Sequence, residues 1–215
     1  MTYNTYIKII AECNFSRSLV SYKQIVKFAN VSPATVNEMT RHLQQQGLVN
    51  RYRYTGVVIT KKGKQLAKKL LYNYRLCEVF LAQQLKIPLV EIPVQAWKMS
   101  DTLEIVTVSA LEKILEYPQR SPFGGSMKTD LLNDETVVRL NQLPERATAV
   151  LVSYLETPSL VKYMNHINLS IDDFIYVKFH DSDLNLIYLE NSDHTEMVIN
   201  SETAEYLYVR QEPKI

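Results

Sequence analysis

The stretch from Val31 to Val49 constrains the fold of this chain most, because it marks both ends of one helix. Ser32 is a good N-cap residue, and Pro33 fits the first helical position without losing a needed hydrogen bond. Gly47 is typical of the residue that ends a helix. The apolar residues that recur at helical spacing are Val36, Met39 and Leu43. The pattern predicts an amphipathic helix with one buried stripe and one exposed face.

The exposed face of this helix carries side chains that are short or form hydrogen bonds. Such side chains can reach base edges in the DNA major groove, so a recognition helix is our first hypothesis. The alternative is an ordinary amphipathic helix of a soluble protein. The candidate DNA contacts from this helix are Ser32, Ala34, Thr35, Asn37, Glu38 and Arg41, and we expect His42 to contact DNA or solvent.

The residues before this helix predict two further helices. Tyr3 to Phe15 places apolar residues on one helical face, and the polar segment after it indicates a loop. Ser21 is expected to cap a second helix, from Tyr22 to Ala29, and a tight turn leads into Ser32. Two short helices, a turn and a capped third helix form a helix-turn-helix pattern.

A short β-hairpin is predicted directly after Gly47. Apolar and polar residues alternate from Leu48 to Tyr54, Thr55 and Gly56 turn the chain, and an apolar run returns it. A hairpin in this position is a wing. Basic residues on or beside it can neutralise phosphates, which adds salt dependence rather than sequence specificity. These residues are Arg51, Arg53, Lys61 and Lys62.

The charge of the chain is unevenly distributed, although the net charge is only +1. Residues 1–75 hold 13 Lys and Arg against only Glu12 and Glu38, whereas the remainder holds 11 against 21 Asp and Glu. A basic module joined to an acidic body suggests a polyanionic partner for the basic part. The alternative is a solvated basic face without a partner.

Other features limit the class of protein. No apolar run is long enough for a membrane span, and no signal peptide is recognisable, so we expect a cytoplasmic protein. Cys13 and Cys77 fall among apolar helical positions and are expected to be buried thiols. With only five glycines there is no phosphate-binding glycine loop, and no nucleophile and base pair is visible, so an enzyme is not expected.

Two long helical regions follow the wing. One begins at Thr60 and runs to about Leu85, and the other runs from Val94 to Leu115. Their apolar residues would form a broad surface that two helices alone could not close, so we expect homodimerisation through it. The alternative is an intramolecular helical bundle.

From Leu140 onward the pattern changes from helical to strand spacing. Five short strands with polar turns, and one helix at Ser159 to Ile167, suggest a small SH3-like β-barrel, with a small open sheet as the alternative. The expected fold is therefore mainly α with β. The expected domains are a winged helix-turn-helix (1–70), a helical dimerisation domain (71–127), a linker (128–139) and an SH3-like domain (140–215).

Several spaced motifs resemble the diphtheria toxin repressor and manganese transport regulator (DtxR/MntR) family of metal-dependent transcriptional regulators. They are S-P-A-T-V-N-E-M in the recognition helix, G-L-V before the wing, Y-T-G-V-V-I-T-K-K-G-K across it, Y-R-L-C-E-V-F-L, and R-S-P-F-G. The segment L-N-Q-L-P at 140–144 resembles the start of the FeoA-like SH3 domain of the longer members. The similarity covers nearly the whole chain.

The resemblance implies a site for Mn²⁺ or Fe²⁺ between the winged domain and the dimerisation helices, where occupancy stiffens the dimer. Most of the ligand set is replaced here, and only Glu78 and Asp101 could ligate. Lys8 stands where manganese-type members carry an acid, and it could pair with Glu78 or Asp101. The family's ligand positions correspond to Thr5, Tyr74, Glu78, Pro93, Trp97, Ser100 and Asp101.

The expected function is that of a homodimeric DNA-binding transcriptional regulator, a repressor by resemblance, that binds a palindromic operator. The replaced ligands predict independence from Mn²⁺ and Fe²⁺, or a response to another signal. Two alternatives stay open: a Mn²⁺- or Fe²⁺-responsive repressor with a rearranged site, and a protein-interaction module with vestigial DNA binding. The cluster of His180, Asp181, Asp183 and His194 is expected to be charged strand ends rather than a metal site.

Overall fold

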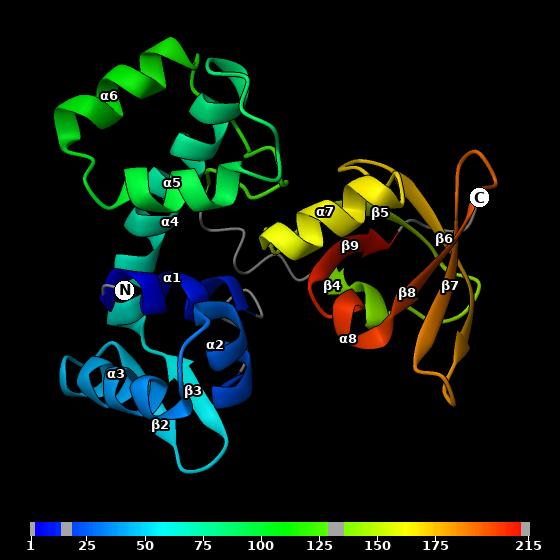
Figure 1. Ribbon diagram of the computed structural model, residues 1–215, viewed down its shortest axis with the longest axis horizontal. Coiled ribbons are helices and arrows are strands. Elements are labelled where there is room, and N and C mark those ends of the chain that lie inside the picture. Colours follow the sequence, from blue (N-terminus) through cyan, green and yellow to red (C-terminus); the bar gives the residue numbers. More distant parts are fainter. Residues whose placement is uncertain (1–2, 14–18, 129–135, 212–215) are drawn as a thin grey trace.

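A computed structural model describes residues 3–13, 19–128 and 136–211. Figure 1 shows three parts: the winged helix-turn-helix in blue and cyan, a helical part in green, and a β-rich C-terminal part in yellow to red. This is the mixed architecture that the sequence predicts. No helix among the described residues is long and apolar enough to cross a membrane.

The winged domain begins with α1 (Tyr3–Glu12), α2 (Tyr22–Ala29) and α3 (Pro33–Gln45). Both predicted N-caps are present. The Ser21 side chain accepts a hydrogen bond from the backbone N–H of Gln24, and Ser32 accepts one from Thr35. Each cap satisfies a backbone donor that the first helical turn leaves free, so these polar residues fix where α2 and α3 begin.

The wing consists of β2 (Val49–Tyr52) and β3 (Gly56–Ile59), as predicted. A short strand that the sequence did not reveal, β1 (Val20–Ser21), pairs with β3 to give the order β1-β3-β2. Gly56 is required at that pairing, since a Cβ there would lie 2.0 Å from the carbonyl oxygen of Val20. The hairpin is thereby tied to the segment that precedes α2.

The long helix α4 (Lys61–Gln83) starts at the N-cap Thr60, as predicted. Its first turn packs against the start of the wing at Gly63, where a Cβ would lie 2.1 Å from the carbonyl oxygen of Leu48. The helix then leaves the winged domain and enters the helical part, so it connects the two.

The helical region predicted from Val94 to Leu115 is two helices, α5 (Ile92–Ser100) and α6 (Ile105–Ile114). The prediction of one continuous helical region was wrong, because the chain turns between Asp101 and Glu104 although apolar residues keep their helical spacing across the turn. α5 and α6 both pack on α4. This rearrangement buries Leu111 while leaving Val106 and Ile114 exposed.

The C-terminal part is one six-stranded antiparallel sheet in the order β4-β9-β5-β6-β7-β8. The five predicted strands are all present. A sixth strand, β4, occupies the last residues of the expected linker at 128–139, and residues 129–135 of that linker lie outside the described part. The strands are β4 (Val137–Arg139), β5 (Thr148–Tyr154), β6 (Phe174–Asp181), β7 (Leu186–Asn191), β8 (Glu196–Asn200) and β9 (Leu207–Gln211).

The predicted closure of these strands into an SH3-like barrel is not shown by the strand pairings. Two helices accompany the sheet: α7 (Pro158–His166), which was predicted, and the short α8 (Ser201–Ala204), which was not. Alternating residues of β5 and β7 are buried, so one face of the sheet forms the core of this part.

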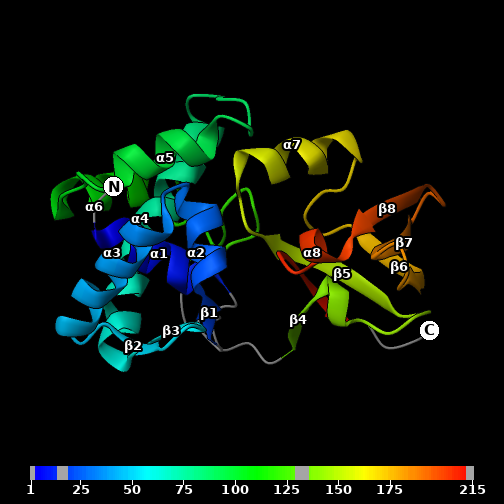
Figure 2. The ribbon, with the colours of Figure 1, turned by 60° about the horizontal axis from the view of Figure 1, so that its bottom comes forward.

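Contacts from distant parts of the sequence join the C-terminal part to the rest. The ring of Phe28 on α2 meets that of Tyr206 edge-to-face at 4.8 Å, and the Tyr208 hydroxyl donates to the carbonyl oxygen of Glu12 over 3.2 Å. The backbone N–H of Tyr154 donates to the carbonyl of Phe123. Figure 2 shows α7 and α8 on the side of the C-terminal part that faces the other two.

Candidate nucleic-acid interface and regulatory centre

The outer face of α3 presents the predicted DNA-contact residues to solvent. Thr35 is partly exposed, and the other five predicted contacts on this helix are exposed. The buried face carries Val36 and Leu43, as predicted, and also Thr40, whose hydroxyl donates to the carbonyl of Val36. The helix therefore has the two-sided character that the recognition hypothesis needs.

Asn37 on α3 and Arg51 on the wing are joined by a hydrogen bond from the guanidinium to the amide oxygen. The same guanidinium donates to the Tyr22 hydroxyl over 3.2 Å. Arg51 thus links the wing, α2 and the recognition helix. Sequence analysis predicted only a phosphate contact for Arg51. The spacing of residues along the chain does not show that the wing lies close to the recognition helix.

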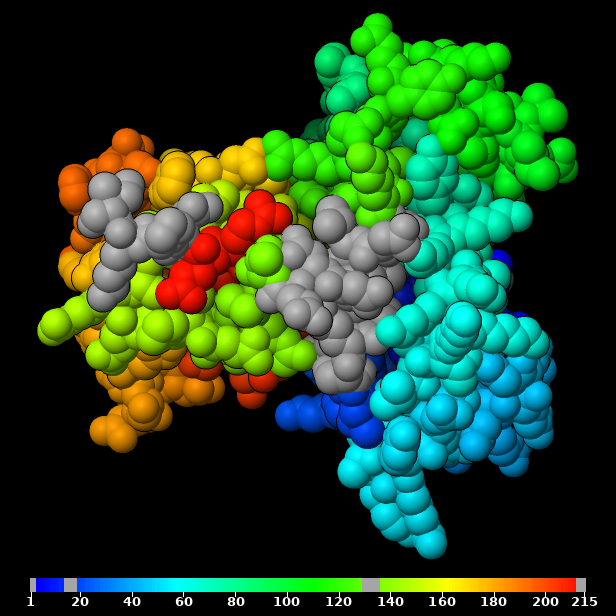
Figure 3. All heavy atoms as spheres, turned by 180° about the vertical axis from the view of Figure 1, so that it is seen from behind, coloured from blue at the N-terminus to red at the C-terminus, as the bar shows by residue number. Residues whose placement is uncertain are grey.

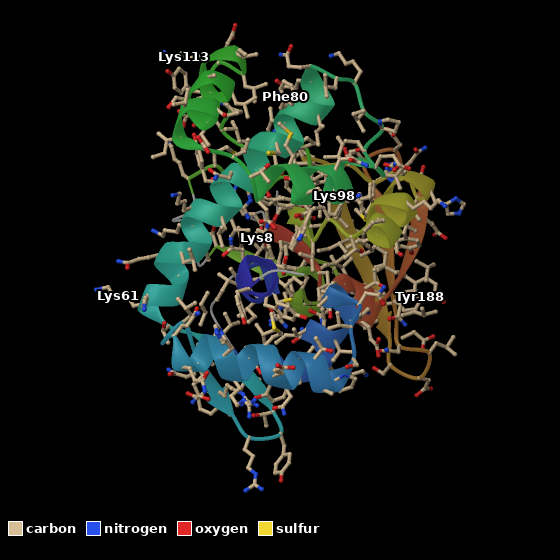
Figure 4. The ribbon with its side chains drawn as sticks, turned by 60° about the vertical axis from the view of Figure 1, so that its left-hand side comes forward. Lys8, Lys61, Phe80, Lys98, Lys113 and Tyr188 are labelled. Carbon is tan, nitrogen blue, oxygen red and sulfur yellow. The ribbon has the colours of Figure 1, made fainter. Side chains whose placement is uncertain are left out.

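The remaining predicted basic DNA contacts are exposed to solvent. Arg53 extends over the ring of Tyr54 at the tip of the wing, and the Lys62 ammonium donates to the carbonyl of Gln46. Figure 4 shows Lys61 at the start of α4, directed away from the core. In Figure 3 the wing projects beyond the body of the protein, where it can reach a groove of a duplex.

His42, which we expect to contact DNA or solvent, is half-buried. Its ring stacks on that of Tyr3 with a centroid distance of 4.0 Å, and its Nδ1 atom is buried. His42 therefore packs α3 against the start of α1. The sequence could not show this, since Tyr3 lies on a different helix.

Behind the winged domain, the buried Lys8 forms the centre of a partly buried polar cluster. Its ammonium lies 3.1 Å from the hydroxyl of Ser100 and 3.2 Å from Oδ1 of Asp101. The same nitrogen lies 4.1 Å from the centroid of the Trp97 ring and 5.3 Å from that of Tyr74. We call these five residues the Lys8 centre. Figure 4 shows Lys8 on α1, next to α4 and α5.

The Lys8 side chain is almost completely removed from solvent, with 1% of it exposed. Burial lowers its pKa, and the neighbouring Asp101 carboxylate opposes this shift. Two hydrogen bonds, one of them an ion pair, and an aromatic face are the compensation that a buried ammonium needs. A positive charge is therefore built into the junction between α1 and α5.

Apart from Glu78, the residues at the family's ligand positions do come together, but they do not form a metal site. Among the described residues, no group of three or more His, Cys, Asp or Glu side chains is placed to hold a metal ion. The indole N–H of Trp97 donates to the Thr5 hydroxyl over 3.3 Å, and the Tyr74 ring packs edge-to-face on Trp97. Pro93 has no donor atom in its side chain. The donor set thus does not fit Mn²⁺ or Fe²⁺.

Glu78, the other surviving carboxylate, lies apart from the Lys8 ammonium in an acidic junction with Glu12, Glu156 and Arg75. Burial, followed by the charge of Glu156, raises the pKa of Glu78 well above its usual value. Burial, followed by the charge of Glu12, raises the pKa of Glu156 to about 8. Arg75 pairs with Glu12 over 2.9 Å and donates to the carbonyl of Ser126.

The acidic junction was missed by sequence reasoning, although a signal was present. Arg75 is the charged residue that precedes the apolar middle of α4, and Glu12 is one of only two acids in the basic first 75 residues. Both are atypical for their surroundings. Their meeting with Glu156 depends on how the C-terminal part docks, which no local pattern reveals.

Family comparisons agree with this arrangement. The model "Iron dependent repressor, N-terminal DNA binding domain" matches residues 2–57, and "Iron dependent repressor, metal binding and dimerisation domain" matches residues 60–129. The chain belongs to the DtxR/MntR family of iron-dependent repressors. It is a DNA-binding transcriptional regulator and not an enzyme, and the two matched domains imply DNA and a second copy of the chain as partners.

Relatives of this DtxR/MntR family member include an uncharacterised regulator and a regulator named MntR. An uncharacterised HTH-type transcriptional regulator of Methanocaldococcus jannaschii is 28% identical over 43% of this chain and 74% of its own length. The HTH-type transcriptional regulator MntR of Oceanobacillus iheyensis is 30% identical over 35% of this chain and 52% of its own length. The match thus spans about half of the named relative.

A solved structure extends the similarity to the whole chain. The manganese regulator SloR is 28% identical, with a TM-score of 0.83, over 99% of this chain and 100% of that one. The C-terminal β-rich part is therefore included in the likeness, as expected for a longer member of the family.

Proposed function

We propose that this protein is a homodimeric repressor whose DNA-binding form does not require Mn²⁺ or Fe²⁺, because the Lys8 ammonium takes the place of the cation. The observation that carries the proposal is the contact of Lys8 with Ser100 and Asp101, two residues at family ligand positions. Like a bound cation, the ammonium joins α1 to the end of α5.

The rest of the ligand positions supports the same proposal. Thr5, Trp97 and Tyr74 are engaged with one another or with Lys8 through hydrogen bonds and ring contacts. A divalent ion placed among them would meet the positive charge of Lys8 at close range, which disfavours binding. A metal-responsive repressor with a rearranged site would need more carboxylates than this cluster offers, since its one carboxylate, Asp101, pairs with Lys8.

The operator we propose is a palindrome read by two copies of α3. A two-fold dimer places its recognition helices in successive or more widely spaced major grooves on one side of the duplex. The exposed apolar residues Ile105 and Val106, at the start of α6, supply a surface for the second copy.

An electrophoretic shift on the DNA upstream of the protein's own gene tests the proposal. Metal-stripped protein with a chelator in the gel and buffer is compared with protein supplied with Mn²⁺ or Fe²⁺. We expect the same shift in all three conditions, abolished by unlabelled operator. A shift that chelation removes and metal restores would support the rearranged metal site. No tight binding to any duplex at low salt would favour the protein-interaction module.

A further inference from the structure

A cavity of about 280 Å³ lies where the three parts of the protein meet. Ile9 and Phe28 come from the winged domain, Val94 and Trp97 come from α5, and Leu155 and Glu156 come from the C-terminal part. This volume is close to the lower limit of about 300 Å³ for small-molecule sites, which tend to lie at domain boundaries. We call it the junction pocket.

The wall of the junction pocket includes residues at the family's former ligand positions. Thr5, Tyr74, Pro93 and Trp97 all line it. These residues replace metal-binding side chains with rings and an alcohol that is already hydrogen-bonded to Trp97. The substitutions therefore remove metal donors and at the same time provide apolar surface for an organic molecule.

The charged groups of the pocket determine which end group a ligand should carry. Two carboxylates, Glu12 and Glu156, line the pocket, and the one lining cation is the exposed Lys98. Glu12 already pairs with Arg75. Glu156 faces two further acids, Glu12 and Glu78, and the charge of Arg75 with a hydrogen bond from Tyr74 only partly offsets their repulsion, so an added positive charge would stabilise its carboxylate. Figure 4 shows Lys98 on α5.

We propose that the junction pocket binds a small organic molecule with an apolar body and one amine, whose ammonium pairs with Glu156. The inference deepens the proposed function, on which it rests for its regulatory part: a regulator without a metal switch uses this ligand as its effector. The body contacts Phe28, Trp97 and Leu155, one residue from each part of the protein. Occupancy therefore changes how the winged domain sits on the other two.

Trp97 offers a direct readout, because it is the single tryptophan of the chain and lines the pocket. Three probes with the same cage and no near-ultraviolet absorption are titrated into the full-length protein: 1-adamantanemethylamine, 1-adamantanemethanol and 1-adamantanecarboxylate. We expect a saturable change in Trp97 emission, with the amine binding at least about tenfold more tightly than the carboxylate. No saturable change with any probe, or equal affinity for amine and carboxylate, would overturn the proposal.

Matched variants test whether the change in Trp97 emission comes from binding in the junction pocket. Val94→Phe narrows the pocket from a side chain that is 43% exposed, and Val198→Phe makes the same change on β8 at 40% exposure. We expect Val94→Phe to weaken amine binding about tenfold or more, and Val198→Phe to leave it unchanged. Glu156→Gln keeps the shape of the side chain and should remove the preference for the amine. Binding unchanged in both Val94→Phe and Glu156→Gln would contradict the assignment.

Operator binding by metal-stripped protein with and without the amine tests the effector role. We expect operator affinity to change by about threefold or more at saturating amine, an effect absent in Val94→Phe. Saturable binding with unchanged operator affinity would overturn that role. A chelator-sensitive operator shift alongside an intact Trp97 response would refute the proposed function while leaving the pocket assignment standing.

Discussion

The Lys8 ammonium lies 3.2 Å from Oδ1 of Asp101, although the two residues are 93 positions apart in the chain. One residue belongs to the first helix of the winged domain and the other follows α5. The pair therefore joins the DNA-binding part to the part that matches the dimerisation domain. A positive charge of the protein itself therefore lies at the junction of these two parts.

Replacing Lys8 by methionine tests the structural value of that charge. The variant keeps most of the side-chain volume but removes the ammonium that contacts Asp101 and Ser100. We expect a loss of about 1–3 kcal/mol in the free energy of unfolding, measured by denaturant titration. We also expect weaker operator binding in a fluorescence anisotropy titration. Lys162→Met, at an exposed position of α7, is the matched control. Equal stability of the two variants would argue against a structural role for the ammonium.

Two arginines of the wing should differ in their effect on DNA binding. Arg53→Ala removes an exposed cation, and we expect weaker binding to all duplexes with a salt slope lower by about one. Arg51→Ala should also alter base preference, because Arg51 holds the amide of Asn37 on the recognition helix. Selection from a randomised operator library measures the preference. Identical preferences for the two variants would show that Arg51 does not orient Asn37.

The exposed apolar end of α6 should be needed for dimerisation. Ile105 is 77% exposed and Val106 is 80% exposed in the single chain. Val106→Asp is expected to raise the dimer dissociation constant by at least about tenfold, measured by sedimentation equilibrium, and to weaken operator binding in parallel. Val198→Asp on β8 should change neither quantity. A Val106→Asp protein that remains dimeric would place the interface elsewhere.

The acidic junction should make stability fall as pH rises. The pKa of Glu156 is raised to about 8 and that of Glu78 is also raised, so the folded protein holds protons that the unfolded chain releases near pH 4.5. The stabilising contribution of these protonated carboxyls is complete below their pKa in the unfolded chain. It is lost as pH rises through their pKa in the folded protein. Thermal unfolding from pH 5 to 9 should show a decreasing Tm, with a shallower slope for Glu156→Gln. Parallel slopes would exclude Glu156 as the titrating group.

Sequence patterns revealed the parts of the fold that depend on local signals. The caps Ser21, Ser32 and Thr60 fixed three helix starts, and alternation predicted the strands of the wing and of the C-terminal part. Features that depend on contacts between distant segments could not be predicted from local sequence patterns. The break between α5 and α6, the pairing of β4 with β9 and the stacking of His42 on Tyr3 all require the tertiary fold.

The Lys8 centre was also predicted in part from sequence, and in part it required the structure. Comparison of motifs was enough to find that the ligand positions are altered and that Lys8 lies near them. The choice of Asp101 over Glu78 as its partner required the structure, because Glu78 lies on α4 and Asp101 follows α5, and local spacing does not show which of them approaches Lys8. Glu156 could not be assigned from sequence at all, since its approach to Glu78 depends on how the C-terminal part docks.

The ratio of two operator dissociation constants tests the central claim most directly. Anisotropy titrations are performed on the same operator with metal-stripped protein in chelator and with protein saturated with Mn²⁺. If Lys8 replaces the cation, the two constants agree within about twofold for the wild-type protein. Tightening of about tenfold or more by Mn²⁺ would mean that a metal still completes the DNA-binding form, and would contradict the account.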